Sequence, residues 1–278
     1  MADAHAASPE ATTTAARRQA SGISRLLPRG WRDFLLQLGL FVVIDLLYEF
    51  TRTLADSNVQ TAFQHARNVV HLERAVGIFN ELDVQHWVLH RSWATSIADY
   101  TYFYSYFTVT VVFMLWMYLR RNDYYYFVRN AVFVADGIAL LGFALYPTAP
   151  PRMLSDLGFV DLLERTATLN HGSFAALANP FAAVPSVHTC YATLTGVVCF
   201  LLVSRRPLKL LFLLYPLLIV FAIVATGNHF WFDAITGATA ALTALSAAWL
   251  IERWHPTLPP SARRRLRLQR STGIAPVI

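Results

Sequence analysis

Two histidines and one aspartate in the second half of the chain have the residue types and spacing that a group-transfer reaction needs. His188 closes the segment Pro-Ser-Val-His, which begins at Pro185, and His229 stands four residues before Asp233. Residues four apart share one face of a helix, so the Asp233 carboxylate can orient the His229 imidazole and leave its other ring nitrogen free to attack. His188 can then donate a proton to the departing oxygen.

The groups around these histidines suit a phosphoryl group. Ser186 and Asn228 stand where two helices are expected to begin, and the unsatisfied N–H groups of helix amino-termini attract oxyanions. The hydroxyl and amide of Ser186 can serve the same anion. Arg152, at the end of Tyr-Pro-Thr-Ala-Pro-Pro-Arg, adds forked donors for phosphoryl oxygens. The pattern predicts a site for phosphoryl transfer.

The same residue types leave a second interpretation open. Two histidines and one carboxylate, here His188, His229 and Asp233, are also the donor set of some metal sites. The oxyanion-binding helix ends favour the first interpretation, so we predict a site without a metal or cofactor. Three other histidines are interpreted as hydrogen-bonded structural groups: His86, His90 and His171.

The elements that position these residues are membrane helices. Of 278 residues, 55% are hydrophobic and 14% charged, and the mean hydropathy of +0.40 exceeds what a water-soluble domain can solvate. Long apolar runs predict an all-α bundle of six transmembrane helices. The predicted spans are about 34–54, 100–119, 127–146, 187–203, 210–225 and 234–251. Asp45, Glu49 and Arg52 interrupt the first.

Basic residues predict the orientation of this bundle. Six spans put both termini on one side, and 17 of the 23 Lys and Arg residues fall on that side. They include Arg17, Arg18, Arg25, Arg29, Arg32, Arg120, Arg121, Arg129, Arg205, Arg206 and Lys209, with six more in the tail. The positive-inside rule makes both termini cytoplasmic and turns the candidate site outward. The net charge of +6 is thus a topology signal and does not point to nucleic acid.

Three parts of the chain are expected. Residues 1–30 form a disordered basic cytoplasmic arm, 31–255 a membrane-embedded catalytic domain, and 256–278 a basic cytoplasmic tail. Within 56–95, apolar residues recur at helical spacing and predict an outer interfacial helix: Ala62, Ala66, Val69, Val70 and Val76. Tyrosines and tryptophans nearby are interpreted as an interfacial belt: Tyr100, Tyr102, Tyr104, Tyr106, Trp87, Trp93 and Trp231.

Some polar and sulfur-containing residues take no part in the predicted site. Cys190 and Cys199 lie in one apolar run, where a helix would keep them too far apart for a disulfide. Acidic residues in or near the spans either line a cavity or form structural pairs, and these alternatives stay open: Asp45, Glu49, Asp99 and Asp136.

Two motifs carry a resemblance to a known family. Pro-Ser-Val-His at 185–188 and His229 with Asp233 resemble the second and third motifs of the type 2 phosphatidic acid phosphatase superfamily. The segments from Tyr146 and Thr226 are similar to those of its inositolphosphotransferase subgroup, which includes inositol phosphorylceramide synthases. The resemblance covers about residues 31–255. It implies a membrane enzyme without a cofactor.

The resemblance also implies residue roles. His229 would be the nucleophile that becomes phosphohistidine, Asp233 its orienting partner and His188 the general acid. Ser186 and Arg152 would bind phosphate.

The chain departs from the family pattern at several positions. Ile223 stands where the phosphatases have an arginine upstream of the nucleophile, Val187 where they often have glycine, and the lysine-containing first motif is absent. Asn228 is a candidate replacement for the missing phosphate ligand; Arg129 is a second, although it is expected near the cytoplasmic end.

These departures favour a lipid phosphotransferase of the inositolphosphotransferase type, acting on a lipid phosphate and a hydroxyl acceptor or water in contact with membrane lipids. The alternative is a lipid phosphate or polyprenyl diphosphate phosphatase with the same intermediate. A non-catalytic membrane protein is a third possibility.

Overall fold

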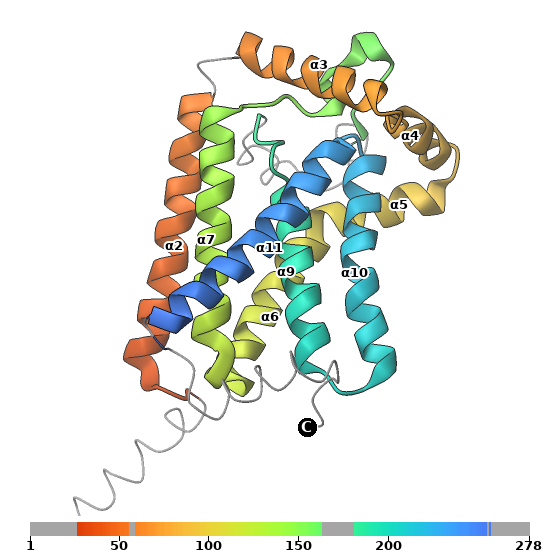
Figure 1. Ribbon diagram of the computed structural model, residues 1–278. Helices are drawn as coiled ribbons and strands as arrows, with labels where there is room; N and C mark the ends of the chain where they lie inside the picture. Colours follow the sequence, from red (N-terminus) through yellow and green to blue (C-terminus); the bar gives the residue numbers. More distant parts are fainter. Residues whose placement is uncertain (1–26, 56–58, 163–180, 255, 257–278) are drawn as a thin grey trace, which may run out of the picture.

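The computed structural model describes residues 27–55, 59–162, 181–254 and 256. These residues form helices and the loops that join them, and no β-sheet occurs among them (Figure 1). Most of the predicted arm (1–30) and tail (256–278) lies outside these residues, as does His171. The side chains of Asp45, Glu49 and Tyr106 are also outside the description.

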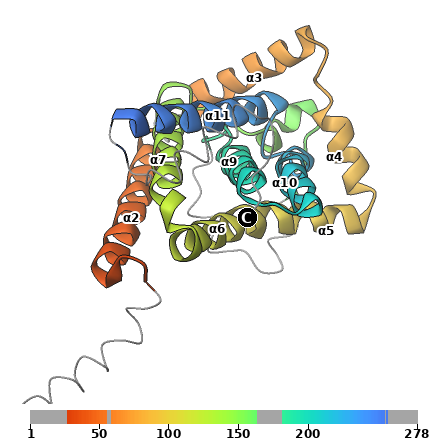
Figure 2. The ribbon, with the colours of Figure 1, turned by 60° about the horizontal axis from the view of Figure 1, so that its bottom comes forward.

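Six long helices form a bundle, and each covers most of one predicted apolar segment (Figure 1). They are α2 (Gly30–Ala55), α6 (Tyr106–Arg120), α7 (Asn122–Leu145), α9 (Val187–Leu202), α10 (Arg206–Ala225) and α11 (Trp231–Trp254). Helix α9 lies inside the bundle and contacts α6, α7, α10 and α11 (Figure 2). Cys190 and Cys199 are both buried on α9 and both free, as predicted.

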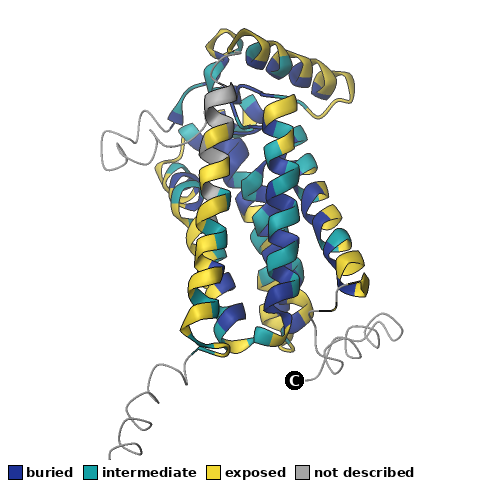
Figure 3. Ribbon diagram, turned by 90° about the vertical axis from the view of Figure 1, so that its left-hand side faces the viewer, coloured by how far each residue is buried: buried dark blue, intermediate teal, exposed yellow. Residues whose placement is uncertain are grey.

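Three of these helices, α7, α10 and α11, are long and apolar enough to cross a membrane. A fourth span results if α5 (Ser92–Tyr100) and α6, which meet at a bend of 42°, count as one. Large apolar side chains are exposed along α2 (Figure 3), among them Leu36 and Leu46, and along α10, among them Leu211 and Leu217. An exposed apolar surface of this extent requires lipid around it.

A polar network ties α2 to its neighbours at one end of the bundle. The Asp33 carboxylate of α2 accepts hydrogen bonds from the hydroxyls of Tyr118 (2.9 Å) and Tyr126 (2.7 Å). Arg129 of α7 donates to the Gln37 side chain of α2 at 3.0 Å. Arg129 therefore joins α2 to α7, and the structure does not place it among the candidate phosphate ligands. Asp136 is likewise a structural partner, since the Tyr191 hydroxyl of α9 donates to it.

Three further helices, α3 (Val59–Ala75), α4 (Glu81–Leu89) and α5, cover the opposite end (Figure 1). Helix α3 is amphipathic, as predicted, but its apolar face packs against protein. Four predicted residues, Ala62, Ala66, Val69 and Val70, are buried in a cluster with Ala149, Leu154, Phe159, Phe181 and Phe230. The prediction that this face meets lipid is wrong, because the loops before α9 and α11 supply the apolar surface against which it packs. Of the five apolar residues predicted to form the face, Val76 alone is exposed.

Close backbone contacts fix the start of α9 between two neighbours. A Cβ atom at Gly237 of α11 would overlap the Ser186 carbonyl oxygen and lie 3.2 Å from the Ser186 carbonyl carbon. On the other side, a Cβ atom at Gly142 of α7 would overlap Pro185. Only glycine lets the helices approach this closely. The approach brings Ser186 and the first turn of α9 against the first turns of α11.

Candidate active site

The structure gathers the six predicted site residues at the end of the bundle that α3, α4 and α5 cover. Arg152 lies in a 3₁₀ turn (Pro151–Met153), Ser186 caps α9 and His188 is in its first turn, Asn228 and His229 lie between α10 and α11, and Asp233 is in the first turn of α11.

Helix α11 begins at Trp231, so the prediction that it begins at Asn228 is wrong. The amides of Asn228 and His229 both donate to the Ile223 carbonyl, at 3.0 and 3.1 Å, and thereby close α10. Gly227 permits the turn with φ +69°. Ile223, where the family has arginine, is fully buried among apolar side chains.

His229 lies between a carboxylate and the second histidine. Its Nδ1 is 3.3 Å from Asp233 Oδ2 and 3.1 Å from the carbonyl oxygen of Ala183. Both partners are acceptors, so Nδ1 carries the proton and Nε2 has the lone pair. The ring centroids of His229 and His188 are 5.5 Å apart. The four-residue spacing thus brings together His229 and Asp233, the two groups predicted from it, although His229 precedes the helix.

Tyr102 contacts the His188 ring and was not predicted to belong here. It lies in a π-helical turn (Thr101–Ser105) between α5 and α6, and its ring stacks on His188 with centroids 4.6 Å apart and planes at 15°. The interfacial-belt interpretation is wrong for Tyr102, whereas Tyr100 and Tyr104 are exposed. Nothing in the sequence marks the π turn, which rotates Tyr102 inward.

Arg152 is held beside the turn that carries His229. Its guanidinium donates to the Asn228 side-chain oxygen, and its backbone N–H donates to the Gly227 carbonyl at 2.8 Å. Its Nε lies 3.3 Å from the Asp161 carboxylate. Asn228 in turn donates to the Thr226 hydroxyl at 2.7 Å. Asp161, which orients Arg152, was missed because no spacing links it to the motifs.

Ser186 has fewer free hydrogen-bond donors for an anion than predicted. Its amide already donates to the Asp233 carbonyl oxygen at 3.1 Å, so the prediction that this amide binds an anion is wrong. The Ser186 hydroxyl oxygen accepts two contacts of 3.4 Å from Thr189. Because the oxygen is the acceptor in both, the hydroxyl proton is available to a ligand.

The amino-terminus of α11 is occupied by carboxyl groups, contrary to the prediction that it binds an oxyanion. The Trp231 amide donates to Glu81 of α4 at 3.2 Å, and the Phe232 amide donates to Glu73 of α3 at 2.7 Å. The preceding amide, of Phe230, donates to Asp233 at 2.9 Å. These three amides, which a phosphate would otherwise use, are thus already satisfied.

Glu73 and Glu81 are buried, with exposed fractions of 1% and 0%. Burial, together with the neighbouring Glu81 carboxyl, raises the pKa of Glu73 to about 9. The sequence analysis missed both residues, because a glutamate on an amphipathic helix is ordinarily solvated.

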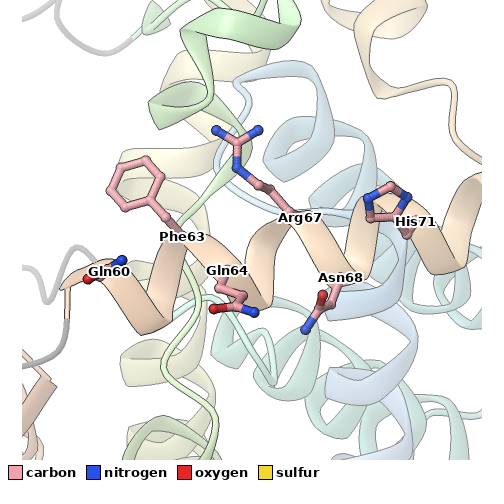
Figure 4. Close-up of a pocket in the computed structure, with 6 residues that line it drawn as sticks. All are labelled: Gln60, Phe63, Gln64, Arg67, Asn68 and His71. Carbon is pink, nitrogen blue, oxygen red and sulfur yellow. The ribbon is translucent and has the colours of Figure 1, made fainter.

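A hollow on α3 lies apart from these residues (Figure 4). Its lining comes from α3 alone: Gln60, Phe63, Gln64, Arg67, Asn68 and His71. Arg67 there forms an exposed ion pair with Asp156 at 2.8 Å. None of the predicted site residues lines the hollow, so its position carries no argument about the reaction.

Within the described part of the chain, no three His, Cys, Asp or Glu side chains are grouped so as to hold a metal ion. The Nδ1 atom of His229 and Oδ2 of Asp233 face each other across 3.3 Å. This contact orients the imidazole and does not converge with His188 on a common point.

Comparison with known proteins gives one match, to a family model. No curated protein and no solved structure matches the chain. A model of the PAP2 superfamily matches residues 67–249, a stretch that includes all six candidate residues and most of the bundle. With its long apolar helices, the chain is therefore a member of the PAP2 superfamily.

Proposed function

We propose that the protein is an integral membrane lipid phosphotransferase that works through a phosphohistidine on His229. The observation that carries this proposal is the placement of the His229 ring, with Nδ1 held by Asp233 at 3.3 Å and the His188 ring 5.5 Å away. A nucleophile, its orienting group and a separate acid are the parts that such a reaction needs.

In the first step, Nε2 of His229 attacks the phosphorus of a lipid phosphate. The N–P bond forms as the bond from phosphorus to the lipid oxygen breaks, and His188, protonated beside the bound phosphate anion, gives its proton to that oxygen. Asp233 stabilises the positive charge that develops on His229. Arg152 neutralises charge on the phosphoryl oxygens and the Ser186 hydroxyl donates a hydrogen bond to them, with Asn228 holding the Arg152 guanidinium.

In the second step, an acceptor hydroxyl attacks phosphorus and the N–P bond breaks. Neutral His188 takes the proton of the hydroxyl, so the enzyme returns to its starting protonation state. An alcohol acceptor makes the enzyme a transferase of the inositolphosphotransferase type. Water makes it a phosphatase. The transferase is favoured because Ile223, fully buried and apolar, replaces a phosphate ligand of the phosphatases.

Six spans, with both termini in the cytoplasm and the site outside, are part of this proposal. All six candidate residues lie at the end where α7 and α10 finish and α9 and α11 begin. Arg120, Arg121, Arg205 and Arg206 lie at the opposite ends of these helices, where the positive-inside rule expects the cytoplasm.

A trapping experiment tests the covalent step. Purified protein is mixed with a lipid phosphate labelled at phosphorus and quenched, and acid-labile, alkali-stable label on protein is counted. His229→Ala removes the label and turnover, because loss of a nucleophile costs several orders of magnitude. His86→Ala, which removes an exposed histidine of α4, keeps both. Turnover of more than a few per cent in His229→Ala would refute the nucleophile.

Product analysis separates the remaining alternatives. With inositol or another alcohol present, thin-layer chromatography should show a new phosphomonoester of that alcohol, whereas a phosphatase releases inorganic phosphate alone. Activity should persist in excess EDTA and fall with vanadate, which seats against a free histidine nitrogen. Activity lost in EDTA and restored by zinc or manganese would make His188, His229 and Asp233 metal ligands.

A further inference from the structure

We propose that Glu73 and Glu81 are positioning residues for the nucleophile: the two carboxyl groups share one proton and hold the first turn of α11. This inference rests on the proposed function, because it concerns the placement of His229. The pair comes from the outer helices α3 and α4, more than 140 residues before His229 in the chain.

The contacts reach the backbone that carries His229 and Asp233. Glu73 accepts from the Phe232 amide at 2.7 Å and Glu81 from the Trp231 amide at 3.2 Å. Trp231 and Phe232, whose amides donate, lie between His229 and Asp233 in the chain. A shift of the pair therefore moves the turn in which Asp233 orients the His229 ring.

A shared proton follows from the burial of both groups. The Oε1 atoms of the two groups accept from the consecutive amides of Trp231 and Phe232, and their Oε2 atoms are buried with no hydrogen-bond partner among the described residues. Because carboxylates are acceptors only, a proton on one of the two groups is the donor that their buried oxygens lack. Two unprotonated carboxylates in this place would repel each other and leave charge buried without a cation.

The charged groups around the pair come from three elements. Glu81 on α4 and Asp233 on α11 both act on Glu73 and both favour its protonated form. Asp233 in turn faces His229, which precedes α11. Arg74, the neighbour of Glu73 on α3, has its guanidinium over the Phe79 ring at 4.8 Å. Glu73 thus loses its proton only as the pH rises through about 9.

The experiment compares three variants with the wild type in detergent from pH 6 to 10.5. Glu73→Ala should lower kcat about tenfold or more with little change in KM, because a misplaced nucleophile weakens the transition state alone. Glu73→Gln keeps an oxygen for the Phe232 amide and a donor for Glu81, so it should recover most of that kcat. Asp83→Asn removes an exposed carboxylate of α4 and is the matched control.

The pH profile distinguishes positioning from a merely structural role. The ratio of kcat in Glu73→Gln to that in wild type cancels every titration that both proteins share. It should rise about tenfold between pH 7 and pH 10, since a group with pKa about 9 is only about one-tenth protonated at pH 10. The same ratio for Asp83→Asn should stay flat. A flat ratio for Glu73→Gln, or wild-type kcat in Glu73→Ala, would overturn the proposal.

The melting temperature over the same pH series separates this inference from the proposed function, because it needs no substrate. Folding raises the pKa of Glu73 from 4.5 to about 9, so the folded state binds the extra proton between these values. Stability is full below about pH 4.5 and is lost as the pH rises through about 9. The melting temperature of Glu73→Gln should fall less than that of the wild type as the pH rises. If no lipid phosphate is turned over but this difference remains, the proposed function fails and the shared proton stands.

Discussion

Replacing Gly237 with alanine should separate the two histidines without unfolding the protein. The added Cβ would overlap the Ser186 carbonyl oxygen and lie 3.2 and 3.3 Å from the carbonyl carbon and Cβ of Ser186. These neighbours are backbone or lie beside it, so they cannot turn aside as the end of a flexible side chain can. Helix α11 must therefore move away from the start of α9, and His229 moves away from His188.

The size of the effect follows from the size of that movement. Relief of the overlap requires a displacement of about 1 Å, and a misplacement of this size in a reacting group costs about 100-fold in kcat. This corresponds to about 2.7 kcal/mol of activation free energy. Overpacking of the helix contact also costs about 1–3 kcal/mol of stability, so the melting temperature should fall while the protein stays folded.

The assay is the kcat of purified Gly237→Ala with the lipid phosphate that the wild type turns over, measured below its melting temperature. Gly137→Ala is the matched control, because nothing lies within 4 Å of a Cβ atom added to this glycine in α7. The control should keep the wild-type kcat. A Gly237→Ala protein that melts earlier and yet keeps full kcat would show that the distance between the starts of α9 and α11 does not govern the reaction.

Three further perturbations test other parts of the molecule. In intact cells, a membrane-impermeant maleimide should label Ser155→Cys and leave Asp123→Cys unlabelled, both positions being exposed; the reverse pattern would invert the proposed orientation. Arg152→Lys should lower kcat/KM about 10- to 100-fold, because a point charge loses one charged hydrogen bond worth about 1.5–3 kcal/mol, whereas the exposed Arg67→Lys should match the wild type. Asp33→Ala should lower the free energy of unfolding by about 1–3 kcal/mol, because it leaves the Tyr118 and Tyr126 hydroxyls without their acceptor; unchanged stability would show that this network is dispensable.

The helices were predictable because each long apolar run must satisfy its backbone hydrogen bonds within itself. The run from Phe127 to Tyr146 corresponds closely to α7, which spans Asn122–Leu145. The start of α11 was not predictable in the same way. Its position depends on the Asn228 and His229 amides turning back to the Ile223 carbonyl, a choice that motif spacing does not reveal.

Some residues of the candidate site were likewise predictable from local sequence, and others depend on how distant segments pack. Spacing within one segment brought His229 and Asp233 together, since four residues span one helical turn. Glu73, Glu81 and Tyr102 act across long separations in sequence, and their contacts exist only once α3, α4 and the π turn are packed. A glutamate can be predicted to be buried only when the group that donates to it is known. The amides that donate to Glu73 and Glu81 lie at the start of α11, far away in the sequence.

The central position of α9 accounts for its modest length. Sixteen residues make a helix about 24 Å long, shorter than the hydrocarbon core of about 30 Å. Enclosed by α6, α7, α10 and α11, it is matched to neighbouring side chains and has little contact with lipid. Mutational tolerance along α9 should therefore follow volume, and a buried Thr195 or Gly196 should resist larger apolar residues that a lipid-facing helix would accept.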